Sequence, residues 1–256
     1  DKGETGMRIV SLNVNGFCGL ADKRGYSFGG SGNSFEENSM EHAGKVCEAI
    51  LKERADVVFL SEFDVCSAAG QEAIRRMKDG GYSPAFPNRW SFISPGYTSI
   101  VVAFVKGACS REKSPGNWLQ WNEMLLQGYR LIGLHITRDS MWEDILAAYE
   151  RHREEKVVFI GDFNVSHRES YGKQKMEDLM KMGAVDAFAA CHGAEADGPA
   201  GNTYVYTGWD GRKGYTRIDY ALLSPAALDF LVSMENRQSA YEAGLSDHAA
   251  LALELK

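Results

Sequence analysis

One apolar run followed at once by polar residues, VVFIGDFNV at 157–165, limits most strongly what this chain can fold into. Val157 to Ile160 are all apolar, which predicts a central strand that is buried on both faces. Asp162 and Asn164 follow at its end, two residues apart, so their side chains project to the same side. Because burying such groups is costly unless a metal, a phosphate or water engages them, the pattern predicts a functional site.

The chain of 256 residues is long enough to bury one large core, which predicts a single α/β domain over residues 7–256. Met7 stands directly before a predicted strand, so residues 1–6 are expected to be a processing remnant. A signal peptide cleaved before Asp1 would leave the same start. The net charge of -7 argues against a dedicated high-affinity nucleic-acid binder. It does not exclude an enzyme that contacts a phosphodiester only locally.

The five cysteines are scattered and lack CxxC spacing, so neither a zinc site nor a disulfide framework is indicated. A reducing, cytoplasmic location fits this pattern, with secretion after signal removal as the alternative. No apolar run approaches the ~20 residues that a membrane-spanning helix needs. We therefore expect no membrane span. We also expect the chain to be a monomer.

Strands and helices are expected to alternate unevenly along one domain without repeats. Strands are predicted in the early and middle parts of the chain at 7–14, 56–63, 98–105, 128–137 and 157–160, and near the C-terminus at 202–206, 215–223 and 248–255. Helices are predicted at 39–54, 71–78, 139–152 and 173–182, with Asp139 as an N-cap. A polar loop is expected between 105 and 128. A long loop, 16–38, is expected to be functional or mobile.

Polar residues recur at the ends of these predicted strands. Taken alone, each has an ordinary structural explanation: an asparagine forms turns, a histidine sits satisfied in a core, and Asp219 pairs with the nearby Arg217. It is less plausible that polar residues stand at so many strand ends by chance than that they line one shared pocket. The residues concerned are Asn13, Asn15, Glu62, His135, Asp162, Asn164, Asp219, Asp247 and His248.

The motifs SLNVNG, FLSEF, GLHIT, GDFN, RIDY and LSDH, in this order, resemble those of the endonuclease/exonuclease/phosphatase superfamily, which includes deoxyribonuclease I and exonuclease III. The resemblance extends from Met7 to Leu255. It implies a four-layer α/β sandwich in which two mixed β-sheets pack face to face and helices flank them. It also implies divalent-metal-dependent hydrolysis of phosphate esters.

The resemblance assigns the metal site to Glu62, as the principal ligand of Mg²⁺ or Mn²⁺. Such hard cations prefer oxygen ligands and keep several waters. Asn15 and Asp247 would complete the coordination. Asn13 would support the site and contact the substrate.

The resemblance also assigns the chemical steps. Asp162 matches the residue that orients or deprotonates the attacking water, and Asn164 would donate to a phosphate oxygen. His248 matches a phosphate-contacting histidine, and Asp219 would hold its ring and raise its pKa by opposite-charge pairing.

His135 bears on the branch of the superfamily. In the exonuclease III and abasic-site branch the corresponding strand typically carries a tyrosine. A histidine here is similar to deoxyribonuclease I, sphingomyelinase, inositol-phosphatase, deadenylase and tyrosyl-DNA phosphodiesterase relatives, where it contacts the phosphate or protonates the leaving oxygen. The histidine at position 135, where the abasic-site branch carries a tyrosine, argues against an abasic-site enzyme.

The segment TYVYTGWDGRKGYTR, at 203–217, mixes aromatic and basic residues. It is expected to be either a hairpin with a solvated basic tip or a loop that stacks bases and grips phosphates. Tyr204, Trp209 and Arg217 are its candidate substrate contacts, and Arg168, just after the GDFN motif, is another.

The sequence therefore predicts a metal-dependent phosphodiesterase or nuclease that acts on nucleic acid by in-line attack of an activated water. The alternative is a small-molecule or lipid phosphatase or phosphodiesterase on the same fold, with substrates such as inositol phosphates or sphingomyelin. A third hypothesis is a non-catalytic binding module, which would require that a catalytic group be missing. The natural substrate and the number of metal ions stay open at this point.

Overall fold

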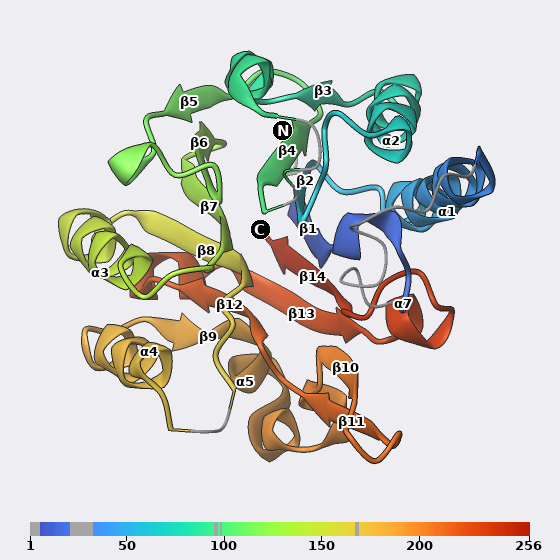
Figure 1. Ribbon diagram of the computed structural model, residues 1–256. Helices are drawn as coiled ribbons and strands as arrows, with labels where there is room; N and C mark the ends of the chain where they lie inside the picture. The colour runs from blue at the N-terminus through green and yellow to red at the C-terminus, as the bar shows by residue number, and fades with distance from the viewer. Residues whose placement is uncertain (1–5, 21–32, 95–96, 98, 167–168) are drawn as a thin grey trace.

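Two six-stranded mixed β-sheets form the centre of the structure, a computed structural model that describes residues 6–20, 33–94, 97, 99–166 and 169–256 (Figure 1). The first sheet has the order β13-β14-β1-β2-β4-β3. Its strands are β1 (Met7–Asn13), β2 (Val57–Ser61), β3 (Ser83–Pro84), β4 (Val101–Val105), β13 (Leu231–Arg237) and β14 (Ala250–Leu255). The second sheet has the order β5-β6-β7-β8-β12-β9. Its strands are β5 (Ser110–Glu112), β6 (Trp121–Leu126), β7 (Tyr129–His135), β8 (Lys156–Asp162), β9 (Val185–Asp186) and β12 (Asp219–Leu223).

Helices cover the outer faces of both sheets, which completes four layers (Figure 1). Helices α1 (Asn33–Lys52) and α2 (Ala68–Asp79) pack on the first sheet, and α3 (Met141–His152) and α4 (Tyr171–Lys181) pack on the second. The shorter helices are α5 (Ala187–His192), α6 (Pro225–Leu228) and α7 (Ser239–Glu242). A separate two-stranded hairpin consists of β10 (Tyr204–Thr207) and β11 (Lys213–Thr216). The predicted four-layer α/β sandwich of two mixed sheets is confirmed.

Strand β8 is apolar throughout because both of its faces are buried. Val158 and Ile160 belong to the core between the sheets, whereas Val157 and Phe159 pack against the helices of the outer layer. The sheets approach closely where Gly133 faces Phe59, since a Cβ at position 133 would lie 2.1 Å from that ring. The burial of apolar surface in both layers is the main stabilising contribution to this fold.

The strand register brings the polar strand ends to one edge. Strands β7 and β8 run parallel with His135 opposite Asp162, and β12 runs antiparallel to β8 with Asp219 opposite the same Asp162. In the other sheet, β1 and β2 are parallel, and Asn13 at the end of β1 lies opposite Ser61. Residues far apart in the sequence therefore meet where these strands end.

Three expectations about the elements are wrong. The region between 105 and 128 is not a loop throughout, because it contains β5 and β6. Buried polar residues hide the strand pattern in β6, where Glu123 pairs with Arg130 of β7 at 2.5 Å. Strand β13, partly exposed along its length, was not predicted. Asp139 is not the N-cap of α3: Ser140 occupies that position, and the Asp139 carbonyl accepts from the Trp142 amide.

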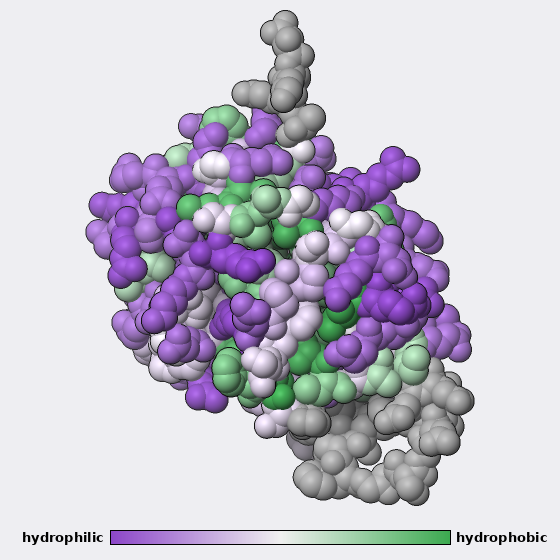
Figure 2. Space-filling view, turned by 90° about the horizontal axis from the view of Figure 1, so that it is seen from above, coloured by the Kyte–Doolittle hydropathy of each residue, from purple (hydrophilic) through white to green (hydrophobic). Residues whose placement is uncertain are grey.

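Some expectations lie outside the described residues, namely most of the predicted remnant 1–6, Arg168, and positions 21–32 of the predicted 16–38 loop. The last part of that loop was predicted wrongly, because α1 begins at Asn33. None of the helices in the described ranges is long and apolar enough to span a membrane. Seen from above, the face over β3 and β5 carries a band of apolar and weakly polar residues between hydrophilic margins (Figure 2). This face lies opposite the β10–β11 hairpin in Figure 1.

Candidate active site

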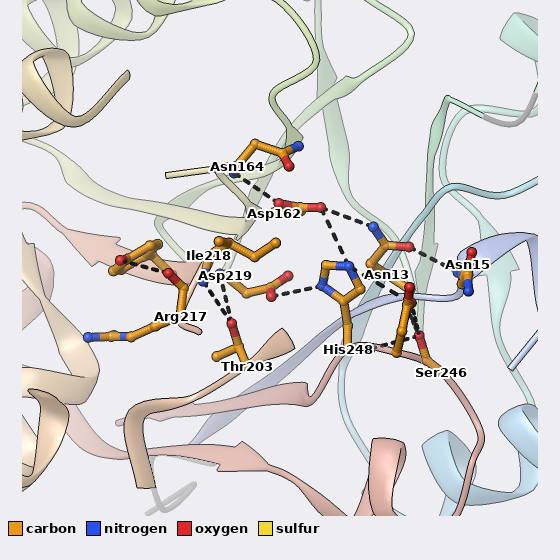
Figure 3. A network of polar contacts seen from close by, with 12 residues as sticks. Asn13, Asn15, Asp162, Asn164, Thr203, Arg217, Ile218, Asp219, Ser246 and His248 are labelled. Atoms are coloured by element: carbon orange, nitrogen blue, oxygen red, sulfur yellow. Dashed lines mark hydrogen bonds and ion pairs between the residues drawn. The ribbon is translucent and has the colours of Figure 1, made fainter. Parts of the chain in front are cut away.

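The converging strand ends open into a cavity of about 570 Å³. Its wall combines carboxylates, amides and a histidine from the sheets with aromatic residues from the hairpin. The lining residues include Asn15, Glu62, Asp162, Asn164, Tyr204, Tyr206, Lys213, Asp247 and His248. Most of the residues predicted from strand ends are therefore neighbours, and Figure 3 shows the network that joins several of them.

Gly161 places Asp162 at the end of β8. Its φ of 143° lies in a region that residues with a Cβ rarely adopt. A Cβ there would also lie 2.0 Å from the carbonyl oxygen of Leu134 in β7. The glycine of the GDFN motif thus allows β8 to stay close to β7, which brings Asp162 level with His135.

Asp162 is held through both carboxylate oxygens (Figure 3). The Asn13 side-chain amide donates to Oδ2 at 3.0 Å, and the Asn164 backbone amide donates to Oδ1 at 2.9 Å. Burial of this side chain, together with the charge of Asp219, raises the pKa of Asp162 to about 7. Each carboxylate oxygen still has acceptor capacity left, so Asp162 can orient a water molecule.

His248 and Asp219 form a buried pair. The His248 Nδ1 lies 2.9 Å from Asp219 Oδ2, and Nε2 lies 4.0 Å from Asp162 Oδ2 (Figure 3). Burial alone would lower the pKa of His248. The charge and hydrogen bond of Asp219, with the charges of Asp162 and Asp247, outweigh burial and raise that pKa to about 9. The alternative explanation for Asp219, an ion pair with the nearby Arg217, does not hold, because the Arg217 guanidinium donates to Asp186 and Asp219 contacts His248.

Two hydroxyl groups that the sequence analysis did not single out fix this pair. Thr203 Oγ1 accepts from the Asp219 amide at 3.0 Å, and Ser246 Oγ accepts from the His248 amide at 3.1 Å. The Ser246 hydroxyl also donates to the carbonyl oxygen of Asn13 at 2.5 Å. Ser246 stands inside the LSDH motif, so its position beside Asp247 was the available signal. Nothing in the sequence distinguishes Thr203 from other strand threonines.

A second group of potential ligands surrounds His135. Its Nε2 lies 3.7 Å from Glu62 Oε1 and 3.5 Å from Asp162 Oδ2. One ligand atom from each of these residues lies within 4.8 Å of the others. Asp162, Asp219 and His248 form a second such group within the described residues.

The cavity fits a divalent cation. Glu62 and Asp162 supply carboxylate oxygens, and Asn15 adds an amide, which together suit hard ions such as Mg²⁺ or Mn²⁺. A cation would also offset the cost of burying Asp162 beside Asp219, which the raised pKa of Asp162 expresses.

Three residues of the site adopt positive φ angles, namely Asn15 at 48°, Glu62 at 54° and Asn164 at 52°. Asparagine tolerates this left-handed region, but it is unusual for glutamate. Local hydrogen bonds hold both asparagines: the Asn15 amide group donates to the carbonyl of Gly19 at 2.8 Å, and the Asn164 amide group to that of Ile136 at 2.8 Å. Backbone strain at Glu62 is typical of functional positions.

The predicted substrate contacts are dispersed. Tyr204 lines the cavity at the strand ends, and its ring centroid lies 4.8 Å from that of His248. Trp209 is fully exposed at the tip of the hairpin. Arg217 lines a neighbouring cavity of about 710 Å³, where its guanidinium pairs with Asp186 at 2.7 Å and lies over the Tyr220 ring.

Several solved structures share this fold across nearly the whole chain. A 3'-5' exonuclease, NExo, from Neisseria meningitidis is 18% identical with a TM-score of 0.67, over 98% of this chain and 100% of that one. An AP endonuclease from Archaeoglobus fulgidus is 13% identical with a TM-score of 0.66, over 98% of this chain and 99% of that one. At these identities the likeness shows the fold alone.

A third structure, described as a 3' phosphatase NExo from Neisseria bound to a product DNA hairpin, is 17% identical with a TM-score of 0.63, over 98% of this chain and 99% of that one. A search of the curated proteins found no match. The family model of the Endonuclease/Exonuclease/phosphatase family, however, matches residues 10–248. That range contains the whole strand-end cluster. The chain therefore belongs to the endonuclease/exonuclease/phosphatase family.

Proposed function

We propose that this chain is a Mg²⁺- or Mn²⁺-dependent phosphodiesterase that cleaves nucleic acid by in-line attack of water. Its family comprises metal-dependent hydrolases of phosphate esters. The observation that carries the proposal is the convergence of Glu62, His135, Asp162 and the Asp219–His248 pair on one cavity edge.

The metal would be held by Glu62 and Asn15, with Asp247 on the other side of the cavity. A bound divalent ion supplies charge neutralisation for the non-bridging oxygens of the phosphate. Glu62 has a φ of 54°, a left-handed conformation that is unusual for glutamate and is found mainly at functional positions, which supports its role as a ligand.

Asp162 would orient the attacking water and accept its proton. Asn13 and the Asn164 backbone amide each bind one carboxylate oxygen, so the carboxylate is fixed before the substrate arrives. Such preorganisation lowers the entropic cost of aligning the water with the leaving group. Asn13 is buried and would act here chiefly by positioning Asp162; its contact with the substrate stays a prediction.

His248 and Asn164 would bind the phosphate, and His135 would assist the leaving oxygen. Asp219 holds the His248 ring through Nδ1, so Nε2 points toward Asp162 and the cavity (Figure 3). His135 Nε2 lies 3.7 Å from Glu62 Oε1 and 3.5 Å from Asp162 Oδ2, and it would be the proton donor to the leaving oxygen. Tyr204, Trp209, Arg217 and Arg168 are proposed contacts for the rest of the substrate.

A substrate panel tests this proposal. Plasmid, single-stranded and abasic DNA, RNA, phosphoinositides, sphingomyelin and an aryl phosphodiester are each incubated with Mg²⁺, with Mn²⁺ and with EDTA. We expect metal-dependent cleavage of a nucleic-acid phosphodiester that Asp162→Ala abolishes. The proposal is wrong if no ester is cleaved, or if EDTA and Asp162→Ala leave the rate unchanged.

A small-molecule or lipid phosphatase is the second candidate. The net charge of -7 and the histidine at position 135 favour it. Such an enzyme would turn over soluble phosphate esters or lipid headgroups in the same panel and would show no salt-dependent binding to DNA.

A further inference from the structure

An aromatic ladder leads from the candidate catalytic histidine out along the β10–β11 hairpin. The Tyr204 ring lies 4.8 Å from the His248 ring, and the Tyr206 ring lies 6.0 Å from that of Tyr204, with 23° between the ring planes. Tyr204 and Tyr206 line the same cavity as Asp162. The ladder therefore connects the reacting centre to the rim of the cavity.

The hairpin register assigns these rings to one face. Tyr206 lies opposite Gly214 and Tyr204 opposite Thr216, whereas Val205 lies opposite Tyr215. Because residues opposite each other in a ladder share a face, Tyr204 and Tyr206 are on one side of the hairpin and Tyr215 is on the other. Tyr215 contacts the Tyr241 ring at 6.0 Å and does not line the catalytic cavity.

Gly214 leaves room for the ring of Tyr206. A Cβ there would lie 2.3 Å from the Tyr206 ring, so the ring rests directly on the backbone of β11. Gly214 does not have a positive φ, so its backbone conformation does not require glycine. The residue pair instead lets the ring of Tyr206 lie flat on the hairpin.

The seated ring remains open to the cavity. Gly214 covers one face of it, yet Tyr206 is 39% exposed and lines the catalytic cavity. A partly exposed aromatic ring beside a phosphate site is an arrangement on which proteins stack an unpaired base. Lys213, on the neighbouring strand, adds a positive charge at the same rim.

We propose that Tyr206, seated on Gly214, is the stacking platform for the base next to the cleaved phosphate, so that the site takes single-stranded nucleic acid. This inference rests on the proposed function. A base can stack on a protein ring only after it leaves its own stack, which excludes a base inside an intact duplex. A grip on one base and one phosphate also suits a chain with a net charge of -7, which lacks a basic footprint for long duplexes.

The alternative is that the Tyr206 ring only covers Gly214 and stabilises the hairpin, as aromatic residues do opposite glycines. A structural role would change the melting temperature. It would not make cleavage depend on whether a base is present next to the phosphate.

The test uses single-stranded oligonucleotides with one cleavable phosphodiester, all others being methylphosphonates. The nucleotide on each side of that phosphate carries a base or is replaced by a baseless tetrahydrofuran residue, and kcat and KM are measured. For the wild type, removing the base on one side should raise KM about tenfold. In Tyr206→Ala the ratio should fall to about one, and Tyr206→Phe should keep it, because stacking needs the ring and not the hydroxyl group.

Two further variants guard against a hairpin that has simply unfolded. Tyr215→Ala removes a ring of the same kind from the opposite face and should keep the tenfold base dependence. Gly214→Ala should lose it, since its Cβ displaces the Tyr206 ring, and should cost nothing more when added to Tyr206→Ala. As a readout without turnover, 2-aminopurine next to the phosphate should be quenched on binding to Asp162→Asn but not to Asp162→Asn with Tyr206→Ala.

The platform is excluded if Tyr206→Ala keeps the base dependence, if Tyr215→Ala loses it as fully, or if the wild type cleaves the baseless oligonucleotides equally well or faster. These results would leave the phosphodiesterase function intact. If the wild type cleaves none of these oligonucleotides but cleaves plasmid DNA or RNA in the substrate panel, the platform is also excluded and the proposed function stands. If it cleaves no nucleic acid of the panel, the proposed function itself fails. The two failures are therefore distinguishable.

Discussion

On the strand-end side of the cavity, Asp162, Asp219 and His248 are buried and linked by hydrogen bonds and close contacts, whereas on the hairpin side Tyr206 and Trp209 are exposed. Asp162, Asp219 and His248 are between 2% and 4% exposed. On the hairpin, Tyr206 is 39% exposed, and its ring contacts that of Tyr204 and lies against Gly214. In the proposed function the first side carries out the chemistry and the second contacts the substrate.

Because one side of the cavity is buried and the other exposed, substitutions on the two sides should affect different kinetic constants. A substitution on the buried side removes a partner from a closed network, so we expect it to lower kcat. A substitution on the exposed hairpin removes a contact with the substrate, so we expect it mainly to raise KM. Substitutions on the two sides of the cavity should therefore differ in their effects on kcat and KM, and a substitution on the remote helix α2 should change neither.

The largest effect is expected from Asp162→Asn. It preserves the shape of the side chain and an acceptor for the Asn164 amide, but it cannot take a proton from water. We expect kcat to fall about 10³-fold with an unchanged melting temperature, measured by initial rates and thermal unfolding. Asp178→Asn, an exposed aspartate on α4, is the matched control and should keep the wild-type rate. A loss of less than tenfold in Asp162→Asn would remove Asp162 from the mechanism.

A smaller loss on the same side is expected from Asp219→Asn. The substitution weakens the 2.9 Å contact that orients the His248 ring, and the ring itself remains in place. We expect kcat to fall about 10²-fold with little change in KM. If Asp219→Asn raises KM and leaves kcat unchanged, His248 binds the phosphate in the ground state without stabilising the transition state, and the contrast between the two sides breaks down.

On the hairpin side, Trp209→Ala is expected to raise KM about threefold and to lower kcat less than twofold. Trp209 is fully exposed at the hairpin tip, so its removal leaves no cavity. Steady-state kinetics on a single-stranded oligonucleotide measure both constants. A fall in kcat larger than the rise in KM would contradict a substrate-contacting role for this side.

The smallest effect is expected on α2, remote from the cavity. Glu72 pairs with Arg75 at 2.7 Å and with Arg76 at 2.6 Å, and these hydrogen bonds lower the pKa of Glu72 to about 2. Glu72→Gln should reduce the free energy of unfolding by about 1 kcal/mol at neutral pH. It should leave kcat and KM unchanged, which separates stability from catalysis.

The sign of its pH dependence follows from the lowered pKa. The ion pairs stabilise the fold fully above the ordinary carboxyl pKa of 4.5, and this contribution is lost as the pH falls toward about 2. Urea unfolding of both proteins between pH 7 and pH 2.5 should therefore show a difference that shrinks as the pH falls. A difference that stays constant would mean that the pairs with Arg75 and Arg76 contribute nothing.

Much of the site was predictable because its residues stand in short motifs at strand ends. The strand before Asp162 was predicted from its unbroken apolar run, and both of its faces are indeed buried. The contacts that hold the site were not predictable, since they join distant positions. The Ser246 hydroxyl reaches the Asn13 carbonyl across 233 positions, and no local pattern announces that contact.

Other elements escaped prediction for related reasons. Glu123 and Arg130 satisfy each other inside the second sheet, so a strand that contains the first of them resembles a loop in sequence. The partner of Arg217 is Asp186, which lies 31 positions away, rather than the nearby Asp219. In the sequence nothing distinguishes Tyr206 from the other tyrosines of its segment, because only the register of β10 and β11 places its ring against Gly214.

The central claim, that the buried strand-end cluster is a metal-dependent phosphodiesterase site, is tested most directly by one metal-removal experiment. The wild-type chain is assayed on a single-stranded oligonucleotide with Mg²⁺, after exhaustive treatment with EDTA, and after Mg²⁺ or Mn²⁺ is restored. We predict that cleavage falls at least 10³-fold without metal and returns when the ion is added back. Cleavage that continues at the same rate in EDTA would contradict the claim.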